Sequence, residues 1–304
     1  MRPNILILGG TGMLGSMVYD YLSKNNNLSV SFTTRSNMQI ASYNSHAKKF
    51  FFDADSIHLN DAFKSLVLQS YSYIINCIGI IKPYCMDNDL EGIHKAIKLN
   101  ALFPHLLYNF VEKYSIKTKI IQIATDCVYS GEKGNYNEYD IHDPQDVYGK
   151  TKSLGEVSGK NFLNIRCSII GPEIHNKLSL LEWFLSQKDN STIYGYDHHK
   201  WNGITTLQFA ELCEKIITDN EFEKCQSYKS VFHYVVNESV TKYELLNIFK
   251  DVFSKNIEIL KVNNIGKPID RTLSSLLNNH EKKPMIDAII ELRSYMNDSK
   301  LYEK

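Results

Sequence analysis

A tyrosine and a lysine stand four residues apart in the segment DVYGKTKSLGE, residues 146–156. Asp143 and Pro144 just upstream predict the start of a helix, and residues at positions i and i+4 share one helix face. Tyr148 and Lys152 would then present a phenol with an ammonium beside it, and a nearby positive charge favours the phenolate form of tyrosine. The pair is a candidate for proton chemistry. The alternative is an ordinary solvated helix face.

The elements that must position this pair alternate regularly through the first half of the chain. Short apolar runs typical of buried strands are followed by longer helical patterns. This alternation predicts an α/β fold of the Rossmann type, a doubly wound parallel sheet with helices on both faces. The strands are predicted at 4–9, 28–34, 48–53, 73–79, 119–125 and 162–171, and the helices from the first strand to about 24 and at 57–70, 93–115 and 144–159.

The rhythm changes after about residue 172. Helices are predicted at 177–188, 205–219, 241–254 and 284–298, with short strands at 231–236 and 257–262. We interpret this part as a smaller α+β lobe for substrate. The predicted division is therefore a dinucleotide-binding domain over 1–171 and a substrate lobe over 172–304, with the chain crossing back to the first domain around 200–225.

A glycine-rich segment, GGTGMLG at 9–15, follows the first strand and opens the first helix. In a dinucleotide site Gly9 would allow the tight turn, Gly12 the approach of the pyrophosphate, and Gly15 the packing of helix on strand. The helix N-terminus favours the phosphate charge. The whole loop is predicted to bind cofactor, including Thr11, Met13 and Leu14. The alternative is a merely permissive loop.

The end of the second strand indicates which dinucleotide is bound. NAD sites usually carry an acid there, whereas this chain offers Arg35 and Ser36. A guanidinium suits a 2′-phosphate, so the sequence favours NADPH and leaves NADH open. Arg35 as an ordinary exposed cation is the alternative. Asp53 and Ala54, at the end of the third strand, are predicted to meet the adenine.

Bulk composition limits the class of protein. The 304 residues are 43% hydrophobic and 22% charged, and Lys plus Arg equals Asp plus Glu at 34 each. A net charge of zero gives no electrostatic case for nucleic acid or membrane partners. Six cysteines without metal-type spacing predict reduced thiols, no metal site and a cytoplasmic protein. The apolar run at the N-terminus is too short for a signal peptide, and no apolar stretch is long enough to span a bilayer.

The chain resembles the extended short-chain dehydrogenase/reductases, and more closely the dTDP-4-dehydrorhamnose reductase family. The resemblance covers nearly the whole chain and rests on the order and spacing of GGTGMLG (9–15), ATDCVYSG (124–131), YGKTKSLGE (148–156), NIRCSIIG (164–171) and WNGITTLQFAEL (201–212). It implies a catalytic trio of Thr125, Tyr148 and Lys152. Hydride delivery to a ketone needs a proton donor in reach, which Tyr148 would be. Lys152 and the oxidised nicotinamide would lower the pKa of Tyr148, and Thr125 would orient the carbonyl oxygen.

Further site residues follow from the same resemblance. Cofactor contacts are implied for Cys77, Ile78, Gly79, Asn100, Tyr148 and Lys152, and substrate contacts for Lys82, Thr125, Asp126, Trp201 and Asn202. Several have plainer alternatives. Asn100 could instead face solvent, Lys82 could be a surface lysine, and Trp201 with Asn202 could form a structural turn.

Two departures narrow the reaction. Sugar-nucleotide 4,6-dehydratases of this superfamily have a glutamate where this chain has Cys127, and a thiol cannot replace that base, so dehydration is not expected. The reductases typically read Arg-Thr-Ser-Trp where this chain has Arg166-Cys167-Ser168-Ile169. Together with CIGIIKPY (77–84) and LLEWFLSQ (180–187), this resembles a branch that includes reductases of UDP-linked 6-deoxy-acetamido sugars.

The resemblance therefore implies NADPH-dependent reduction of the C4 ketone of a nucleotide-linked 4-keto-6-deoxyhexose, for surface polysaccharide synthesis. A homodimer is compatible with it. Two alternatives stay open. One is an NAD-dependent sugar-nucleotide epimerase, and the other is a non-catalytic NADP-binding regulatory subunit resembling the methionine adenosyltransferase β subunit.

Overall fold

A seven-stranded parallel sheet runs through the computed structural model, which describes residues 2–35, 48–56, 71–114, 117–175, 177–226, 229–263 and 266–302. The strand order is β11-β6-β5-β4-β1-β2-β3, and every neighbouring pair is parallel. The strands are β1 (Asn4–Leu8), β2 (Ser29–Thr34), β3 (Lys48–Phe51), β4 (Tyr73–Asn76), β5 (Lys119–Ile123), β6 (Phe162–Arg166) and β11 (Val231–His233).

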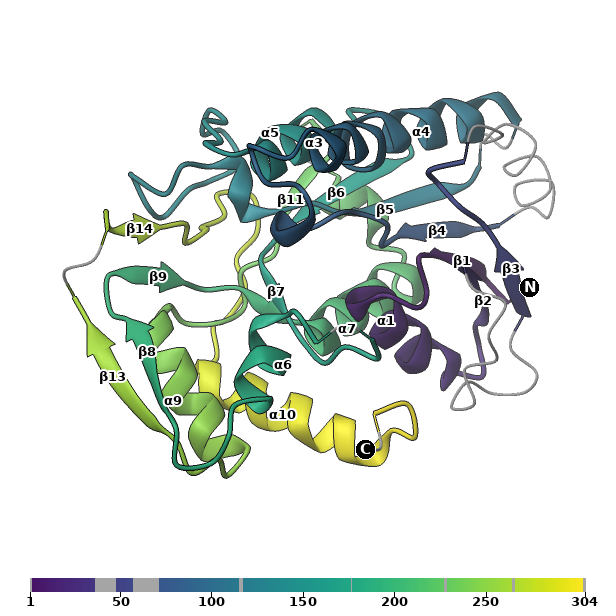
Figure 1. Cartoon of the computed structure of the whole chain (residues 1–304). Helices are drawn as coiled ribbons and strands as arrows, with labels where there is room; N and C mark the ends of the chain where they lie inside the picture. The colour runs from purple at the N-terminus through teal and green to yellow at the C-terminus, as the bar shows by residue number, and fades with distance from the viewer. Residues whose placement is uncertain are drawn as a thin grey trace.

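Helices cover both faces of this sheet (Figure 1). On one face lie α3 (Leu90–Ala96), the π-helical turn η2 (Ile97–Leu102), α4 (Phe103–Tyr114) and α5 (Val147–Leu154), and on the other lie α1 (Met13–Ser23) and α7 (Thr206–Thr218). The predicted Rossmann-type fold class is confirmed. The helix predicted at 57–70 lies outside the described residues.

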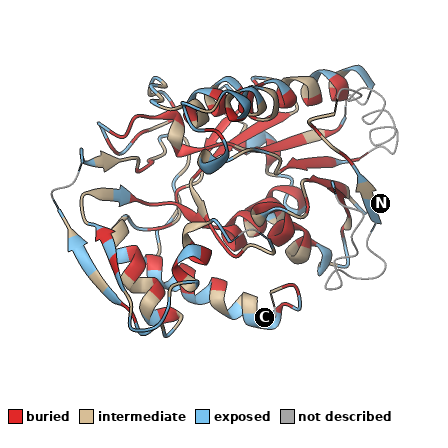
Figure 2. Cartoon of the chain, in the orientation of Figure 1, coloured by how far each residue is buried: buried red, intermediate tan, exposed pale blue. Residues whose placement is uncertain are grey.

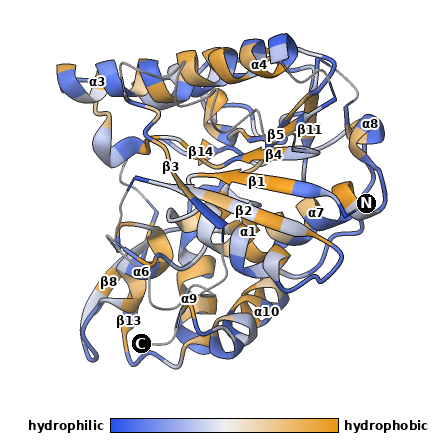
Figure 3. Ribbon diagram, turned by 90° about the vertical axis from the view of Figure 1, so that its right-hand side faces the viewer, coloured by the Kyte–Doolittle hydropathy of each residue, from blue (hydrophilic) through white to orange (hydrophobic). Residues whose placement is uncertain are grey.

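The central strands explain why the sheet forms where it does. Ile5, Leu6 and Ile7 of β1 are at most 1% exposed, as expected of a parallel strand that is covered on both faces. Buried positions follow the sheet in Figure 2, and Figure 3 shows β1 as a hydrophobic strand. The edge strand β3 is mostly exposed and begins with two lysines, which discourages pairing with another chain.

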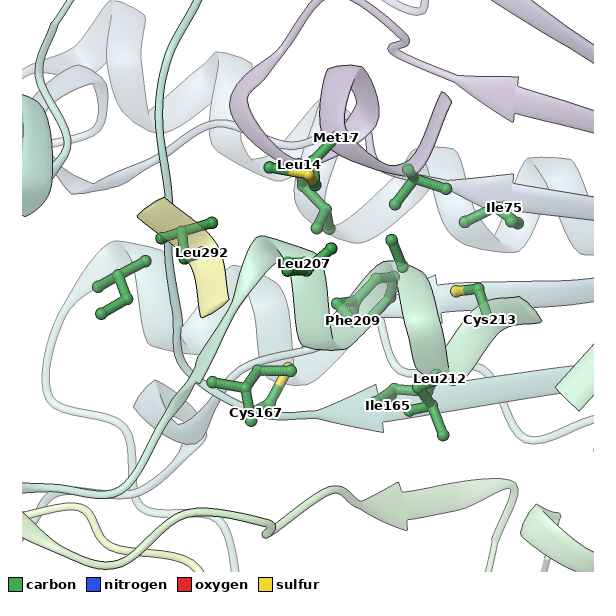
Figure 4. Packing of buried hydrophobic residues seen from close by; sticks show 14 of the residues in the cluster. Leu14, Met17, Ile75, Ile165, Cys167, Leu207, Phe209, Leu212, Cys213 and Leu292 are labelled. Carbon is green, nitrogen blue, oxygen red and sulfur yellow. The ribbon is translucent and has the colours of Figure 1, made fainter. Parts of the chain in front are cut away.

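One core cluster joins the sheet to the helices beneath it (Figure 4). Leu14 and Met17 of α1 meet Leu207 of α7, and Ile75 of β4 belongs to the same cluster. Since α7 packs on α1 and β11 pairs with β6, residues 206–233 contribute to the same layers as the N-terminal half.

Most of the remaining elements lie beyond the carboxyl end of the sheet (Figure 1), whereas the second half of α10 (Met285–Asp298) packs on α1, where Tyr295 contacts Tyr21 and Asp20. They pair in small sheets, β13 with β8 and β12-β9-β14, and α9 packs on β8 and β13. Their bounds are α6 (Leu180–Leu185), β8 (Thr192–Tyr196), β9 (His199–Trp201), β12 (Val240–Thr241), α9 (Lys242–Val252), β13 (Glu258–Val262), β14 (Ile269–Asp270) and α10 (Met285–Asp298). The division at 171/172 stays a prediction.

Two strand predictions differ from the structure. The strand predicted at 162–171 ends at Arg166, and β7 (Ile169–Ile170) leaves the main sheet to pair with β10 (Ile204–Thr205). The strand predicted at 231–236 within the second lobe becomes β11 of the main sheet. Strand partners depend on contacts far apart in the chain, which local periodicity does not encode.

Candidate active site

The helix that carries Tyr148 and Lys152 starts three residues later than its predicted start at 144. Asp146 is the N-cap of α5, and its carboxylate accepts a hydrogen bond of 2.8 Å from the Gly149 amide. Asp143 instead accepts from the amide and hydroxyl of Ser130, at 2.7 and 2.6 Å. An aspartate at either position suits a helix start, and only the cap geometry identifies which one acts.

Thr125 meets Tyr148 at the carboxyl end of β5. Its hydroxyl caps the short 3-10 turn η3 (Asp126–Val128), accepting from the Cys127 amide at 3.2 Å. The Thr125 side chain also interacts with the Tyr148 phenol, and this interaction by itself lowers the pKa of Tyr148. The end of a strand and the first turn of a helix thus bring a hydroxyl and a phenol to one point.

The pKa of Tyr148 is shifted by its surroundings in the protein. Burial raises this pKa above its ordinary value, Cys127 and Asp126 raise it further, and the interaction with Thr125 opposes them. Lys152 is not among the principal influences on this pKa in the protein without cofactor, and lowering of the pKa by Lys152 together with the oxidised nicotinamide stays a prediction. The raised pKa leaves the phenol protonated at neutral pH.

Lys152 is buried on the same helix, with 6% of its surface exposed. Its Nζ donates a 2.6 Å hydrogen bond to the carbonyl oxygen of Ile123, the last residue of β5. Burial lowers the pKa of Lys152 to about 8, while the charges of Glu156, Cys167 and Cys77 act to raise it. The ammonium therefore lies at the end of β5, two residues before Thr125 in the chain.

The glycine-rich loop has the geometry that its sequence predicts. Gly9 has a φ of +79°, which favours glycine, and a Cβ at Gly15 would lie 2.2 Å from the Gly9 carbonyl oxygen. Within α1, no side chain caps the N-terminus and no acid occupies the first turn. The first-turn amides therefore fit an anionic group such as a dinucleotide phosphate. Thr11 and Met13 flank Gly12 in this loop, whereas the Leu14 side chain points into the core.

Other predicted cofactor residues gather around this loop. The Cys77 amide donates to the Leu8 carbonyl oxygen at 3.0 Å, and Ile78 is the side chain that a Cβ at Gly9 would meet. Gly79 follows within the same segment. Arg35 is exposed just after β2, Asp53 accepts from the Asp55 amide at 3.1 Å, and Ala54 is buried. Ser36 lies outside the described residues.

Asn100 links two parts of the site. It is 1% exposed, so the solvent-facing alternative is wrong. Its side chain exchanges two hydrogen bonds with the backbone of Ile80, at 2.8 and 3.0 Å, and donates to the Thr151 hydroxyl at 3.3 Å. Asn100 thus fastens the loop after β4 to α5. A direct contact with cofactor stays a prediction.

Three cations surround Cys127, and sequence reasoning identified only the first, Lys82. The Lys82 Nζ pairs with Asp146 at 2.7 Å and lies 5.9 Å from the Tyr148 ring centroid. Arg271 donates from Nε to the Tyr129 carbonyl oxygen at 2.9 Å. Burial raises the pKa of Cys127 to about 12, while Lys82 and Arg271 act to lower it.

The third cation, Lys242, is the first residue of α9. Burial lowers its pKa, and the charges of Asp126 and Cys127 act in the opposite direction. Its Nζ lies 5.0 Å from the Trp201 ring, and no ion pair of Lys242 occurs among the described residues. The sequence predicts that Lys242 lies at the start of a helix. It does not indicate that the side chain lies close to Asp126 and Cys127.

The predicted substrate residues Trp201 and Asn202 are both buried. The Asn202 amide exchanges two hydrogen bonds with the Leu273 backbone, at 2.8 and 2.9 Å. These contacts join Asn202 to a segment far away in the chain, and a substrate contact stays a prediction. Asp126 is also buried, 3.2 Å from the Thr125 hydroxyl through its Oδ1.

Across the described ranges, no group of three or more His, Cys, Asp or Glu side chains could hold a metal ion. In the same ranges, no helix has the length and apolarity needed to cross a membrane.

The parallel sheet, the glycine loop and the Thr125, Tyr148 and Lys152 cluster define a protein of the extended short-chain dehydrogenase/reductase class. More specifically, the chain belongs to the family described as "RmlD substrate binding domain", whose model matches residues 1–301. The predicted family is therefore confirmed.

Solved structures share this fold. A dTDP-4-dehydrorhamnose reductase from Clostridium acetobutylicum is 20% identical with a TM-score of 0.73, over 97% of this chain and 99% of that one. A dTDP-4-dehydrorhamnose reductase from Bacillus anthracis, in complex with NADP, is 16% identical with a TM-score of 0.73, over 97% and 100%. Among curated proteins, methionine adenosyltransferase 2 subunit beta from Bos taurus is 26% identical over 262 residues, 83% of this chain and 73% of that protein.

Proposed function

We propose that this protein is an oxidoreductase that reduces the C4 ketone of a nucleotide-linked 4-keto-6-deoxyhexose, with NADPH as cofactor. The observation that carries the proposal is the interaction of the Thr125 hydroxyl with the Tyr148 phenol at the end of β5, with Lys152 held at Ile123 beside it. A proton donor and an orienting hydroxyl at one point are what ketone reduction requires.

Each residue of the trio has a distinct role in this reaction. When bound, NADPH supplies the hydride to the carbonyl carbon. The Tyr148 phenol, neutral at neutral pH, gives its proton to the carbonyl oxygen as negative charge develops there. The Thr125 hydroxyl donates a hydrogen bond to the same oxygen. Lys152 stabilises the phenolate that remains, because an opposite charge favours the ionised form.

The surrounding groups suit the two phosphate-bearing ligands. The glycine loop and the free first-turn amides of α1 fit the pyrophosphate of the cofactor, and Arg35 suits a 2′-phosphate. Lys82, Lys242 and Arg271 are positive charges around Cys127, next to Tyr148, and suit the diphosphate of a nucleotide sugar.

The proposal is tested by following NADPH absorbance with a panel of UDP- and dTDP-linked 4-keto-6-deoxy sugars, acetamido forms included. One substrate should support oxidation of NADPH, and Tyr148→Phe should abolish it. Tyr114→Phe is the matched control, because Tyr114 is 46% exposed at the end of α4. No turnover with any sugar, in protein that binds NADPH, would contradict the reductase.

A second candidate is a non-catalytic regulatory subunit, favoured by the curated relatives at 26% identity. It predicts NADPH binding without turnover, and a change in the activity of a methionine adenosyltransferase when this chain is added. The intact Thr125, Tyr148 and Lys152 weigh towards catalysis. An NAD-dependent epimerase would instead be purified with its cofactor bound and would convert a nucleotide sugar without added reductant.

A further inference from the structure

Helix α5 is fastened to the sheet at two points four residues apart. Lys152 reaches the carbonyl oxygen of Ile123 on β5 at 2.6 Å. Glu156, just after the end of α5, binds Arg166 on β6 through two hydrogen bonds of 2.7 Å, Nε to Oε1 and a terminal nitrogen to Oε2. Ile123 is paired with Ile165 across the two strands, so both fastenings lie at the same level of the sheet.

The Arg166 side chain is itself fixed on its other side. The other terminal guanidinium nitrogen, Nη1, donates to the Tyr129 hydroxyl at 2.8 Å and to Nε2 of His233 at 3.1 Å. His233 in turn donates from Nδ1 to the Ser274 carbonyl oxygen at 2.8 Å. The Arg166 and Glu156 side chains are only 5% and 8% exposed, so the fork that holds Glu156 has little freedom to move.

We propose that Glu156, clamped by Arg166, is a positioning residue for Lys152. Its carboxylate fixes the rotation of α5 against β5 and β6, and so keeps the Lys152 ammonium on the Ile123 carbonyl beside Tyr148. Its charge also keeps that buried ammonium protonated. The role rests on the proposed function of Lys152. A purely structural ion pair is the alternative, since buried pairs are weak evidence for any role beyond packing.

The groups around Lys152 point to Glu156 as the charge that matters. Cys77 after β4 and Cys167 after β6 face the ammonium from the sheet side. Glu156 faces it from just beyond the end of α5, the helix that carries Lys152. Burial raises the pKa of Cys77 to about 12 and raises that of Cys167 further, so both thiols are neutral at neutral pH. Among these described neighbours, Glu156 is therefore the group that carries a negative charge. Its carboxylate is paired with Arg166 and also lies close to His142.

The test is a direct titration of Lys152 in the whole chain without substrate. Lysine is labelled with 13C, its Cε resonances are followed from pH 6 to 11, and Lys152→Met identifies the resonance. In Glu156→Gln, which keeps the shape of the side chain, the pKa of Lys152 should fall by about one unit or more, as expected on removal of a close opposite charge. Glu138→Gln is the control, because Glu138 is 2% exposed and binds Ser275 and Leu276 instead.

An unchanged Lys152 titration in Glu156→Gln would overturn the proposal, whatever happens to thermal stability. If that variant does not fold, Glu156→Asp decides, because it keeps the charge but withdraws it by one methylene. A lowered pKa of Lys152 there supports the role, and an unaltered pKa refutes it. The titration requires no turnover, so it separates failure of this inference from failure of the proposed reaction. With an active substrate, the basic limb of the pH–rate profile should move to lower pH together with the titration.

Discussion

The Nζ of Lys152 lies 2.6 Å from the carbonyl oxygen of Ile123, two residues before Thr125 in the chain. One strand end therefore fixes both the ammonium on α5 and the hydroxyl that meets Tyr148. The two sides of the candidate site cannot shift independently, because both are attached to β5.

The pH dependence of turnover should report the titration of Lys152. Burial lowers the pKa of Lys152 to about 8, so the ammonium is present below that pH and is lost above it. If the ammonium is required, kcat/KM falls about tenfold per pH unit above about 8. Arginine does not deprotonate in this range. The kcat/KM of Lys152→Arg should therefore be lower than that of the wild type, but it should not change with pH up to 9.5. A wild-type profile that is flat to pH 9.5 would exclude this role.

Thr125 should act through its hydroxyl. Thr125→Val removes the hydrogen bond to the reacting oxygen, and kcat should fall about 10²–10³-fold. It also removes the cap on the Cys127 amide, which should cost about 1 kcal/mol of unfolding free energy. Thr125→Ser keeps both bonds and should stay within about tenfold of wild type. Steady-state kinetics and thermal unfolding test this, and equal activity of Val and Ser variants would contradict it.

Two glycine substitutions in one loop should have opposite consequences. A Cβ at Gly15 lies 2.2 Å from the Gly9 oxygen, so Gly15→Ala should destabilise the fold by about 1–3 kcal/mol. A Cβ at Gly12 meets only the Gly9 oxygen at 3.5 Å, so Gly12→Ala should fold normally but weaken NADPH binding at least about tenfold. Thermal unfolding and NADPH fluorescence titration separate the two effects. Unimpaired NADPH binding by Gly12→Ala would remove the loop from the cofactor site.

We expect Lys242 to strengthen binding of the nucleotide sugar without contributing to the stability of the fold. Lys242→Met removes a half-buried cation at a helix N-terminus, so the protein should be as stable or more stable. The KM for the nucleotide sugar should rise about 10–100-fold, in line with a lost hydrogen bond to a charged group, and NADPH affinity should not change. Lys250→Met, near the end of the same helix, is the control. An unaltered KM in Lys242→Met would show that the diphosphate lies elsewhere.

Acid should destabilise the protein partly through His233. Burial and the charge of Arg166 lower the pKa of His233 to about 4, from the 6.5 of an exposed histidine. The unfolded chain then takes up a proton at a higher pH than the folded one does. Stability should therefore fall as pH drops from 6.5 to about 4, by about 3 kcal/mol from this group. Urea unfolding at several pH values measures this slope.

His233→Asn is the variant that isolates this contribution. Asparagine has no group that titrates between pH 4 and 7, so the variant should lose less stability on acidification. It should be less stable than the wild type at neutral pH, because its short amide does not replace the contacts of the His233 ring. Identical slopes for wild type and His233→Asn would assign the acid sensitivity to other groups.

Much of the Rossmann half could be predicted from the sequence because its signals are local. The apolar run of β1 is long enough to be a buried strand, and the glycines after it satisfy turn and packing requirements that few other residues meet. The spacing of Tyr148 and Lys152 likewise predicts one helix face, and α5 contains both residues. These features depend on neighbours within a few positions, so the sequence displays them directly.

The convergence of distant residues was decided only by the tertiary structure. Nothing near Arg271 or Lys242 in the chain indicates that both surround Cys127, and Glu156 and Arg166 occur in separate motifs. The pKa of Tyr148 is raised by burial and by the neighbouring Cys127 and Asp126, an arrangement that no local pattern contains. Sequence by itself determined the helices, the strands and the chemical types available. Packing between segments far apart in the chain decided the strand partners, the cap at Asp146 and the electrostatics of the site. The reason is that this packing determines which polar and charged groups are buried and which partners they have.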